Sequence, residues 1–192
     1  MIAIIKYNAG NIRSVLNSVT RLGYDSIITD KKDDLLTADK IILPGVGEAA
    51  SAMKDLRERG IDKILLSIDK PVLGICLGLQ LLCLDSEEGN AKCLGVFNSH
   101  VRKFPPKDKV PHTGWDNFKS LDGTLLKGLK ASDDFYYVHS YYSEICKYTT
   151  AVCDYILPFS AVMQKNNFYA VQFHPEKSAE AGEKVMKNFL EL

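Results

Sequence analysis

Apolar runs alternate with segments of helical period through the first half of the chain. Four short runs, rich in isoleucine, valine and leucine, predict strands over 2–7, 24–29, 40–43 and 71–75. The segments that follow these runs repeat apolar residues every three or four positions and predict helices over 12–22, 48–59, 61–68 and 77–84. Asn11 is the expected N-cap of the first helix, and Gly23 is expected to end it. This alternation predicts a parallel sheet covered by helices on both faces.

The second half of the chain has a different pattern, in which strand-like runs follow one another directly. These runs predict strands over 94–104, 113–118, 135–142, 150–155, 160–164 and 168–173. Part of this region is expected to extend the main sheet in the antiparallel direction, and a last helix is expected over 178–190. No internal repeat or low-complexity linker interrupts the sequence, so residues 1–192 are expected to form one domain.

Composition excludes several classes of protein. The 24 basic and 24 acidic residues give a formal net charge of zero, which argues against a nucleic-acid surface. No stretch approaches the roughly 20 apolar residues that a membrane helix needs. The opening residues lack the cationic head and cleavage site of a signal peptide. We therefore expect a cytoplasmic, globular protein that binds neither nucleic acid nor membrane.

The spacing of the cysteines is not that of a disulfide framework or a structural zinc site. There are five, at positions 76, 83, 93, 146 and 153, and no two of them make a C-x-x-C pair. The odd count and the spacing disfavour structural zinc and a disulfide scaffold, so no metal or cofactor is expected. Four of them are expected to be small buried hydrophobes.

The fifth cysteine lies in a distinctive turn. Gly74-Ile75-Cys76-Leu77-Gly78 has the Gly-x-Cys-x-Gly pattern of a nucleophile elbow, with sulfur in place of the serine oxygen. Cys76 would then stand at a helix N-terminus, where the dipole and free N–H groups favour a thiolate. The alternative is a small residue at a tight turn without chemistry, and the pentapeptide alone does not exclude it.

A cysteine nucleophile needs a base, and the base needs a group that orients it. His174 follows a late predicted strand, and in open α/β sheets the functional residues gather at the carboxyl ends of strands. Cys76 ends a strand too, so both are expected at one sheet edge. Glu176, two residues after His174, is able to accept a hydrogen bond from the second imidazole nitrogen.

The other histidines are weaker candidates. His139 is a rival base, but its aromatic neighbours favour a core or interface histidine. His112 is expected to be a loop residue, and His100 is expected to face solvent.

A glycine-rich loop follows the third predicted strand. The purely structural interpretation of Pro44-Gly45-Val46-Gly47 is a turn between a strand and a helix. In the functional interpretation its amides point N–H groups at an oxyanion, with the Leu77 N–H as the second donor. A phosphate-binding loop is disfavoured because no Gly-Lys-Ser/Thr follows.

Together these residues resemble the class I (triad) glutamine amidotransferases. The matching motifs, spread over essentially the whole chain, are Pro44-Gly45-Val46-Gly47, Gly74-Ile75-Cys76-Leu77-Gly78-Leu79-Gln80 and Val171-Gln172-Phe173-His174-Pro175-Glu176. The motifs Tyr7-Asn8-Ala9-Gly10-Asn11, Val110-Pro111-His112-Thr113-Gly114-Trp115-Asp116 and Tyr137-Val138-His139-Ser140-Tyr141 make the chain similar to the branch that serves histidine biosynthesis. The resemblance implies a flavodoxin-like α/β fold.

The resemblance also implies roles for individual residues. Cys76 would attack the side-chain amide of glutamine, His174 would protonate the leaving ammonia, and Glu176 would orient His174. The amides of Val46 and Leu77 would form the oxyanion hole, the first of them after a change in its loop. Four residues would hold the substrate's α-amino and carboxylate groups: Gly47, Gln80, Ser140 and Tyr141.

The implied partner is a separate cyclase chain of the (β/α)₈-barrel type, bound as a heterodimer, which would receive the ammonia. Four residues match positions near that interface: Asn11, Trp115, Tyr136 and Lys177. Small departures from the family pattern, such as Leu79 and Asp116, leave open a paralogue that feeds another synthase, for example in amidino-sugar synthesis.

Two further alternatives are disfavoured by the sequence. Trp115 and the Pro-Gly-Val-Gly loop argue against a glutaminase for anthranilate or carbamoyl-phosphate synthesis. The intact set of Cys76, His174 and Glu176 argues against a non-catalytic regulatory module on the same fold.

Overall fold

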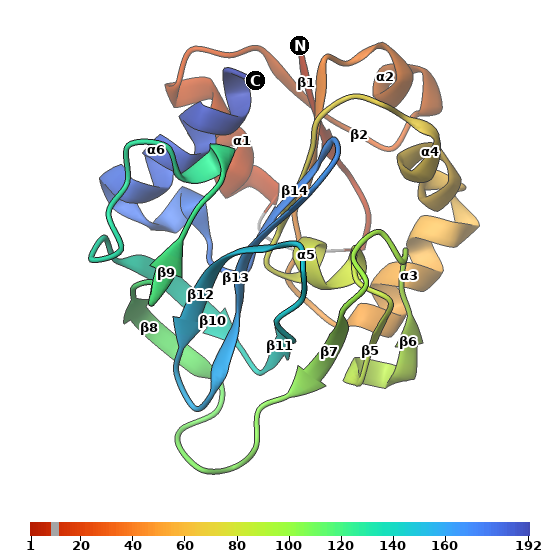
Figure 1. Cartoon of the computed structure of the whole chain (residues 1–192). Helices are drawn as coiled ribbons and strands as arrows, with labels where there is room; N and C mark the ends of the chain where they lie inside the picture. Colours follow the sequence, from red (N-terminus) through yellow and green to blue (C-terminus); the bar gives the residue numbers. More distant parts are fainter. Residues whose placement is uncertain (9–11) are drawn as a thin grey trace.

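One eight-stranded sheet organises the molecule (Figure 1). The computed structural model describes residues 1–8 and 12–192. Five parallel strands run in the order β2-β1-β3-β4-β14, which is the flavodoxin-like order. Their bounds are Ser26–Thr29 (β2), Ile2–Ile5 (β1), Lys40–Leu43 (β3), Val72–Ile75 (β4) and Phe168–Val171 (β14). The antiparallel strands β13 (Pro158–Lys165), β12 (Thr149–Asp154) and β9 (Ser120–Leu121) extend the sheet at one edge.

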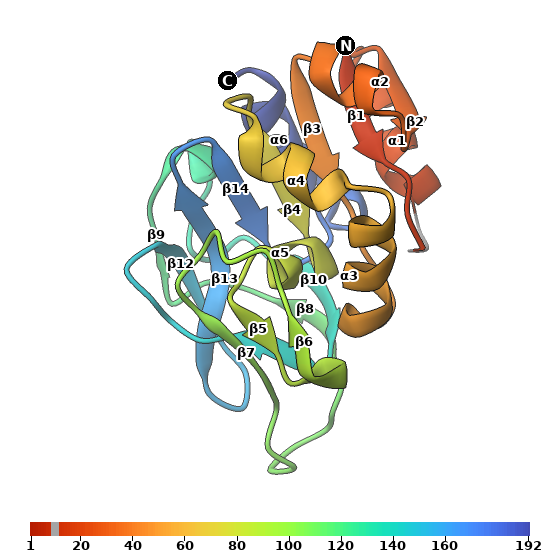
Figure 2. The ribbon, with the colours of Figure 1, turned by 90° about the vertical axis from the view of Figure 1, so that its right-hand side faces the viewer.

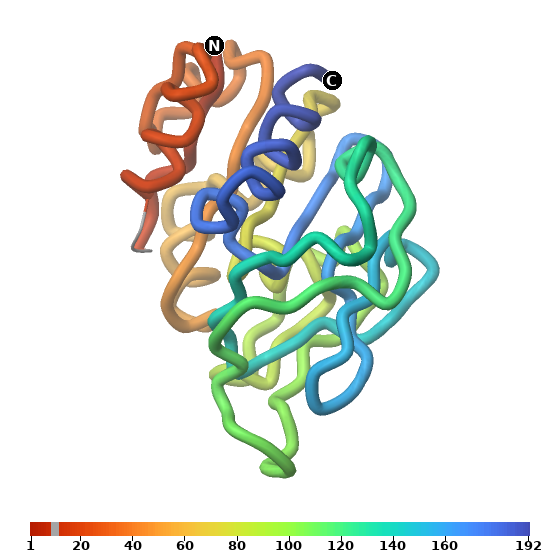
Figure 3. The backbone as a smooth tube through the Cα atoms, turned by 90° about the vertical axis from the view of Figure 1, so that its left-hand side faces the viewer, coloured from red at the N-terminus to blue at the C-terminus, as the bar shows by residue number. Residues whose placement is uncertain are grey.

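Helices cover both faces of this sheet. On one face α1 (Ile12–Arg21) and α6 (Ala179–Leu190) lie side by side, at the red and blue ends of the chain in Figure 3. The other face is covered by α2 (Lys32–Thr37), α3 (Ala49–Glu58), α4 (Ile61–Ser67) and α5 (Leu77–Leu81), of which α3 and α4 stand out in Figure 2. Strands β1 and β4 are buried along their whole length because helices cover them on both sides.

Two smaller sheets are also formed by residues that the structure describes. Strands β10 (Phe135–His139) and β8 (His112–Asp116) form an antiparallel pair. The second small sheet has the order β11-β7-β5-β6, with bounds Tyr141–Ser143, His100–Lys103, Asp85–Ser86 and Ala91–Lys92. In the described part of the chain, three short 3₁₀ turns connect the elements: η1 (Glu88–Asn90), η2 (Thr124–Leu126) and η3 (Pro175–Lys177).

The predicted parallel sheet with helices on both faces and an antiparallel extension is confirmed. The predicted strand over 94–104 is wrong in its first half, because residues 94–99 form a loop with Gly95 at φ 72°. The predicted strand over 135–142 is two strands in different sheets, separated at Ser140. Helix α2 and the short strands β5, β6 and β9 were not predicted, since each is too short to establish a period.

No helix in the described part of the chain combines the length and the apolar character that crossing a bilayer requires.

Candidate active site

Cys76 lies at the sharp turn between β4 and α5. Its backbone has φ 54° and ψ −106°, a conformation that is rare for a residue with a side chain and is associated with functional sites. The backbone N–H of Cys76 donates to the carbonyl of Val171 at 2.8 Å, which fixes the turn beside the end of β14. The strained residue of the elbow is therefore the cysteine itself.

The glycines on either side of the elbow are required by close approach. A Cβ at Gly78 would lie 2.0 Å from the Leu43 carbonyl oxygen, because α5 passes directly over the end of β3. A Cβ at Gly74 would lie 2.8 Å from backbone atoms of Gly78. The two glycines thus allow α5 to begin against the sheet, with Cys76 at its N-terminus.

His174 follows β14, and the structure brings it to the same sheet edge as Cys76. Its Nδ1 lies 2.9 Å from Oε1 of Glu176, and both side chains are almost fully buried. The His174 N–H donates to the Tyr136 carbonyl at 2.9 Å. Ser178 donates its hydroxyl to the His174 carbonyl at 2.6 Å and accepts from the Tyr136 N–H at 2.9 Å. The histidine segment is thereby fastened to β10, a role for Ser178 that the sequence did not indicate.

The imidazole of His174 is electrostatically poised. Burial alone lowers the pKa of His174, but interaction with Cys76 and Glu176 outweighs burial and raises the pKa to about 10. The Nε2 atom is buried without a well-aligned hydrogen bond to any described residue, although Cys76 acts on the ring through both hydrogen bonding and charge. Hydrogen bonds between catalytic groups often become short only when the substrate binds.

The substitution Glu176→Gln is expected to lower the pKa of His174 by about one to three units, because a neutral amide replaces the carboxylate. The raised pKa means that the protonated ring stabilises the folded state. This contribution to the free energy of unfolding is complete below pH 6.5 and is lost as the pH rises through about 10. In the variant, the pH at which it is lost is expected to be lower because the pKa of His174 is lower. NMR titration of the His174 ring measures the change, with Glu180→Gln in α6 as a matched control. An unaltered titration in Glu176→Gln would refute the orienting role.

The loop after β3 lies against the elbow. Of the two backbone N–H groups predicted to form the oxyanion hole, those of Val46 and Leu77, one is already bonded within the protein. The Leu77 N–H donates to the Gly45 carbonyl at 3.3 Å. Gly47 has φ 126°, a backbone conformation that favours glycine. The buried hydroxyl of Tyr7 donates to the Pro44 carbonyl and anchors the start of the loop. The second predicted oxyanion donor is therefore occupied by the loop's own carbonyl in this conformation.

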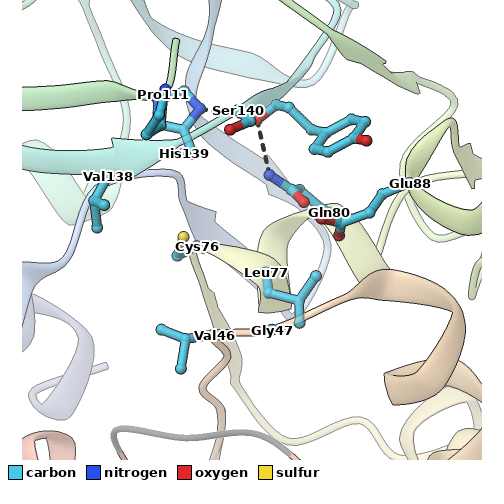
Figure 4. Close-up of a pocket in the computed structure, with 11 residues that line it drawn as sticks. Val46, Gly47, Cys76, Leu77, Gln80, Glu88, Pro111, Val138, His139 and Ser140 are labelled. Atoms are coloured by element: carbon cyan, nitrogen blue, oxygen red, sulfur yellow. Dashed lines mark hydrogen bonds between the residues drawn. The ribbon is translucent and has the colours of Figure 1, made fainter.

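A cavity of about 250 Å³ opens between the elbow and the small strands (Figure 4). The predicted binding residues Gly47, Gln80, Ser140 and Tyr141 all line it, together with Val46, Cys76 and Leu77. Its volume is at or below the lower end of the range for drug-sized ligands, about 300–1,000 Å³, which suits a molecule of amino-acid size. The side chain of Cys76 also lines the cavity, and Figure 4 shows its sulfur among the lining residues.

Glu88 also lines the cavity and was not predicted from the sequence. Among the described residues in the cavity wall it is the one carboxylate. Burial, and to a lesser extent the charge of Glu48, raises the pKa of Glu88, although the Ala49 N–H bond at 2.9 Å opposes this. No sequence pattern marks it, because it reaches the cavity from a separate 3₁₀ turn, η1.

The prediction that His112 is a loop residue is wrong. His112 is buried in β8, where its ring stacks on Tyr155 with centroids 4.0 Å apart. His139 is buried as predicted, and burial lowers the pKa of His139 to about 3. The two rings lie 3.3 Å apart between Nδ1 of His112 and Nε2 of His139, and Nδ1 of His139 bonds the Tyr141 carbonyl at 2.8 Å. These contacts leave His139 without a free nitrogen for use as a base.

Three of the predicted interface residues form one exposed cluster near His174. Trp115 is 55% exposed and packs edge-on against Tyr136, with ring centroids 5.9 Å apart. The Lys177 ammonium lies 5.7 Å from the centre of the Tyr136 ring. A hollow of about 500 Å³ between Trp115 and η3 is lined by both Lys177 and Glu176. Asn11 lies outside the described residues.

No group of three or more His, Cys, Asp or Glu side chains in residues 1–8 and 12–192 is arranged to hold a metal ion.

Comparison with known proteins gives a consistent picture. Residues 3–192 match the family model described as glutamine amidotransferase class-I. The chain is 54% identical to a protein of Bacteroides fragilis (strain YCH46) named imidazole glycerol phosphate synthase subunit HisH, covering 100% of this chain and 99% of the relative. It is 43% identical to the protein of that name from Vibrio parahaemolyticus, covering 100% of this chain and 98% of the relative.

Solved structures share the fold at lower identity. A crystal structure of a glutamine amidotransferase superposes with a TM-score of 0.75 at 20% identity, covering 99% of this chain and 97% of that chain. A second glutamine amidotransferase, from Thermotoga maritima, gives a TM-score of 0.66 at 16% identity, covering 99% of this chain and 80% of that one.

Proposed function

The chain belongs to the class I glutamine amidotransferase family and is related along its whole length to the HisH subunits, and from this we propose that it is the glutaminase subunit of an imidazole glycerol phosphate synthase. It hydrolyses L-glutamine to glutamate and ammonia. The cyclase subunit uses the ammonia to form imidazole glycerol phosphate and 5-aminoimidazole-4-carboxamide ribonucleotide (AICAR) in histidine biosynthesis. The observation that carries the proposal is a strained Cys76 in the wall of an amino-acid-sized cavity, beside the buried pair of His174 and Glu176.

In the first half-reaction the Cys76 thiolate attacks the side-chain carbonyl carbon of glutamine. The carbonyl oxygen becomes an oxyanion, which backbone N–H groups stabilise. His174 enters this step protonated, consistent with its raised pKa, and gives its proton to the leaving nitrogen. The C–N bond breaks, ammonia leaves, and a γ-glutamyl thioester remains on Cys76.

In the second half-reaction water replaces ammonia. His174 is now neutral and takes a proton from the attacking water, whose oxygen bonds to the thioester carbon. The C–S bond breaks, Cys76 and His174 return to the thiolate and imidazolium, and the γ-carboxylic acid that forms loses its proton to water to give glutamate. Glu176 keeps Nε2 of His174 directed at the reacting atoms by holding Nδ1.

The oxyanion loop must rearrange before this chemistry is efficient. The Gly45 carbonyl and the Val46 N–H belong to one planar peptide group. Rotation of that group would withdraw the carbonyl from the Leu77 N–H and direct the Val46 N–H toward the same space. One movement would therefore supply both predicted donors, and the glycines on either side of Val46 lower its cost.

Glu88 suits the α-ammonium group of a bound amino acid. It supplies a carboxylate to the cavity wall, while Gln80, Ser140 and Tyr141 supply polar groups for orientation. As the pH falls through the raised pKa of Glu88, the carboxylate becomes neutral and its attraction for an ammonium group is lost.

The substitution Glu88→Gln is expected to raise KM for glutamine by about 10- to 100-fold with a smaller effect on kcat, because a hydrogen bond to a charged group is lost. Glutamine at this position retains an oxygen for the Ala49 N–H. Steady-state kinetics of the complex measure the effect, with Glu87→Gln as control because Glu87 lies outside the cavity wall. Wild-type KM is expected to rise at acidic pH, and the Gln variant is expected to lose that rise. An unchanged KM in Glu88→Gln would remove Glu88 from substrate binding.

We assign the exposed cluster of Trp115, Tyr136 and Lys177 to the face that binds the synthase subunit, a (β/α)₈ barrel in a heterodimer. An aromatic pair with an adjacent cation is typical of binding hot spots. Tyr136 of this cluster is hydrogen-bonded to the backbone of His174 and to Ser178. Ammonia released beside His174 would therefore travel only a short distance to a partner bound at the cluster. Transfer within a complex keeps ammonia unprotonated, since ammonium has no lone pair for attack. We place the complex in the cytoplasm.

The test is an assay of glutamate formed from L-glutamine by the chain, alone and together with its synthase subunit. Glutamate production in the complex, coupled to synthesis of the imidazole product, supports the proposal. Glutamate production without imidazole formation would favour a paralogue that serves another synthase, and no glutamate in either case would contradict the glutaminase assignment.

A further inference from the structure

Gln172 is a fully buried polar residue next to the nucleophile that neither the motifs nor the mechanism above assigns. It lies between β14 and His174, and its backbone N–H donates to the Ala161 carbonyl at 2.9 Å. Its side-chain Nε2 lies 3.6 Å from Sγ of Cys76. Its Oε1 lies 3.2 Å from Nε2 of Gln80, which lines the cavity. A buried amide with both ends bonded is costly to displace, so this side chain has one orientation.

The hydrogen-bond pattern determines which end of the Gln172 amide faces the sulfur. The chain starts at the Tyr141 carbonyl, which can only accept. Gln80 therefore directs its NH₂ group at that oxygen, at 2.9 Å, and the same NH₂ group reaches Gln172. The atom of Gln172 that receives it must be the oxygen, so the Gln172 NH₂ group is the end that points at Cys76.

The start of this chain is itself fixed. His139 bonds the Tyr141 carbonyl from the other side through Nδ1, at 2.8 Å. Because burial and its neighbours keep the His139 ring neutral, Nδ1 carries a proton that it donates to this carbonyl. The Tyr141 carbonyl thus has two donors on it, which leaves the amide orientations of Gln80 and Gln172 determined by the fold.

We propose that Gln172 is a positioning residue that donates a hydrogen bond to the Cys76 thiolate, fixes the direction of the sulfur and links it to the substrate-binding residue Gln80. An N–H donor to an anionic sulfur is a charge-assisted bond, stronger than one to a neutral thiol. It therefore favours the thiolate before attack and weakens once the sulfur is acylated. The inference deepens the proposed function, because it takes Cys76 as the nucleophile.

Alkylation of Cys76 by iodoacetamide tests this without any glutaminase activity. In Gln172→Met the side chain keeps its length but has no donor. The pH at which the alkylation rate is half-maximal is expected to rise by about one unit, from loss of a hydrogen bond to a charged group. Gln172→Glu is nearly isosteric. In this variant a carboxylate faces the sulfur, and the pH at the half-maximal alkylation rate is expected to rise further. Peptide mapping separates Cys76 from the partly exposed Cys146, which serves as an internal reference.

Matched variants and steady-state kinetics separate positioning from packing. Gln164→Met makes the same chemical change on β13, outside the cavity wall, and is expected to change neither the profile nor the rate. Gln172→Met is expected to lower kcat about tenfold in the complex with a smaller change in KM. If Gln172→Met fails to fold, Gln172→Glu answers the question alone, since its shape is retained.

An unchanged alkylation profile and kcat in a folded Gln172 variant would overturn the proposal and leave Gln172 as a packing residue. A shifted profile in a chain whose wild type makes no glutamate, with or without the synthase subunit, would uphold the positioning role and contradict the proposed function instead.

Discussion

The Cys76→Ala variant is expected to lose glutamine hydrolysis by at least about 10⁴-fold, because no other group can form the thioester. Removal of a nucleophile that acts together with its base abolishes the covalent route, and only binding and oxyanion stabilisation remain. The neighbouring geometry is expected to survive, since the Cys76 backbone, whose N–H bonds Val171, is kept in the variant. Glutamate release from glutamine by the complex, followed by a coupled assay, measures the loss.

The control is Cys83→Ala, which removes a buried thiol from the chain just beyond α5 without touching the cavity. It is expected to retain activity. Binding of Cys76→Ala to the synthase subunit, measured by calorimetry, is expected to equal that of wild type because the thiol is not on the exposed cluster. Retained glutamine turnover in Cys76→Ala would contradict the assignment of Cys76 as the nucleophile of the triad.

Binding of the ligand-loaded synthase subunit is expected to raise the glutaminase rate by about 10²- to 10³-fold over the isolated chain. One missing oxyanion donor costs about that factor in other enzymes. In this conformation the Leu77 N–H is bonded to the Gly45 carbonyl, so at least that donor is unavailable until the loop rearranges. The isolated chain is thus expected to hold a nearly complete triad with an incomplete oxyanion hole.

Comparison of three samples checks this: the chain alone, with the empty synthase subunit, and with that subunit and its ligand. The rate is expected to rise mainly in kcat, since the missing interaction is made in the transition state. The alkylation rate of Cys76 is the control, because it needs no oxyanion hole and is expected to change far less. A full glutaminase rate in the isolated chain would refute gating by the loop.

The contiguous motifs were the most predictable part of the site. The elbow around Cys76 and the His174–Glu176 pair each lie within a few residues of sequence, and a short backbone segment largely fixes its own geometry. Their meeting could be anticipated as well, because the carboxyl ends of β4 and β14 must share one edge of a parallel sheet. The helices and strands of this sheet could be predicted because their buried faces impose a regular spacing of apolar residues on the sequence.

Other features had no local pattern to announce them. Glu88 reaches the cavity from η1, and nothing in its neighbours distinguishes it from the exposed carboxylates nearby. His112 precedes a glycine motif that resembles a loop, yet pairing of β8 with β10 buries it beneath Tyr155. The continuous aromatic run over 135–142 hides the break at Ser140, where the chain passes from one small sheet to another.

The sequence by itself determined the alternation of strands and helices in the parallel part of the main sheet apart from α2, the elbow with Cys76 at its turn, and the choice of His174 and Glu176 as its partners. These follow from short-range constraints: side-chain period, glycine where backbones approach closely, and the carboxyl ends of parallel strands. The tertiary structure alone decided that the Gly45 carbonyl occupies the Leu77 N–H, that Glu88 joins the cavity, and that Gln172 points its amide at the sulfur. Each of these depends on contacts between segments far apart in the chain, whose directions are set only when the small sheets close over the edge of the large one.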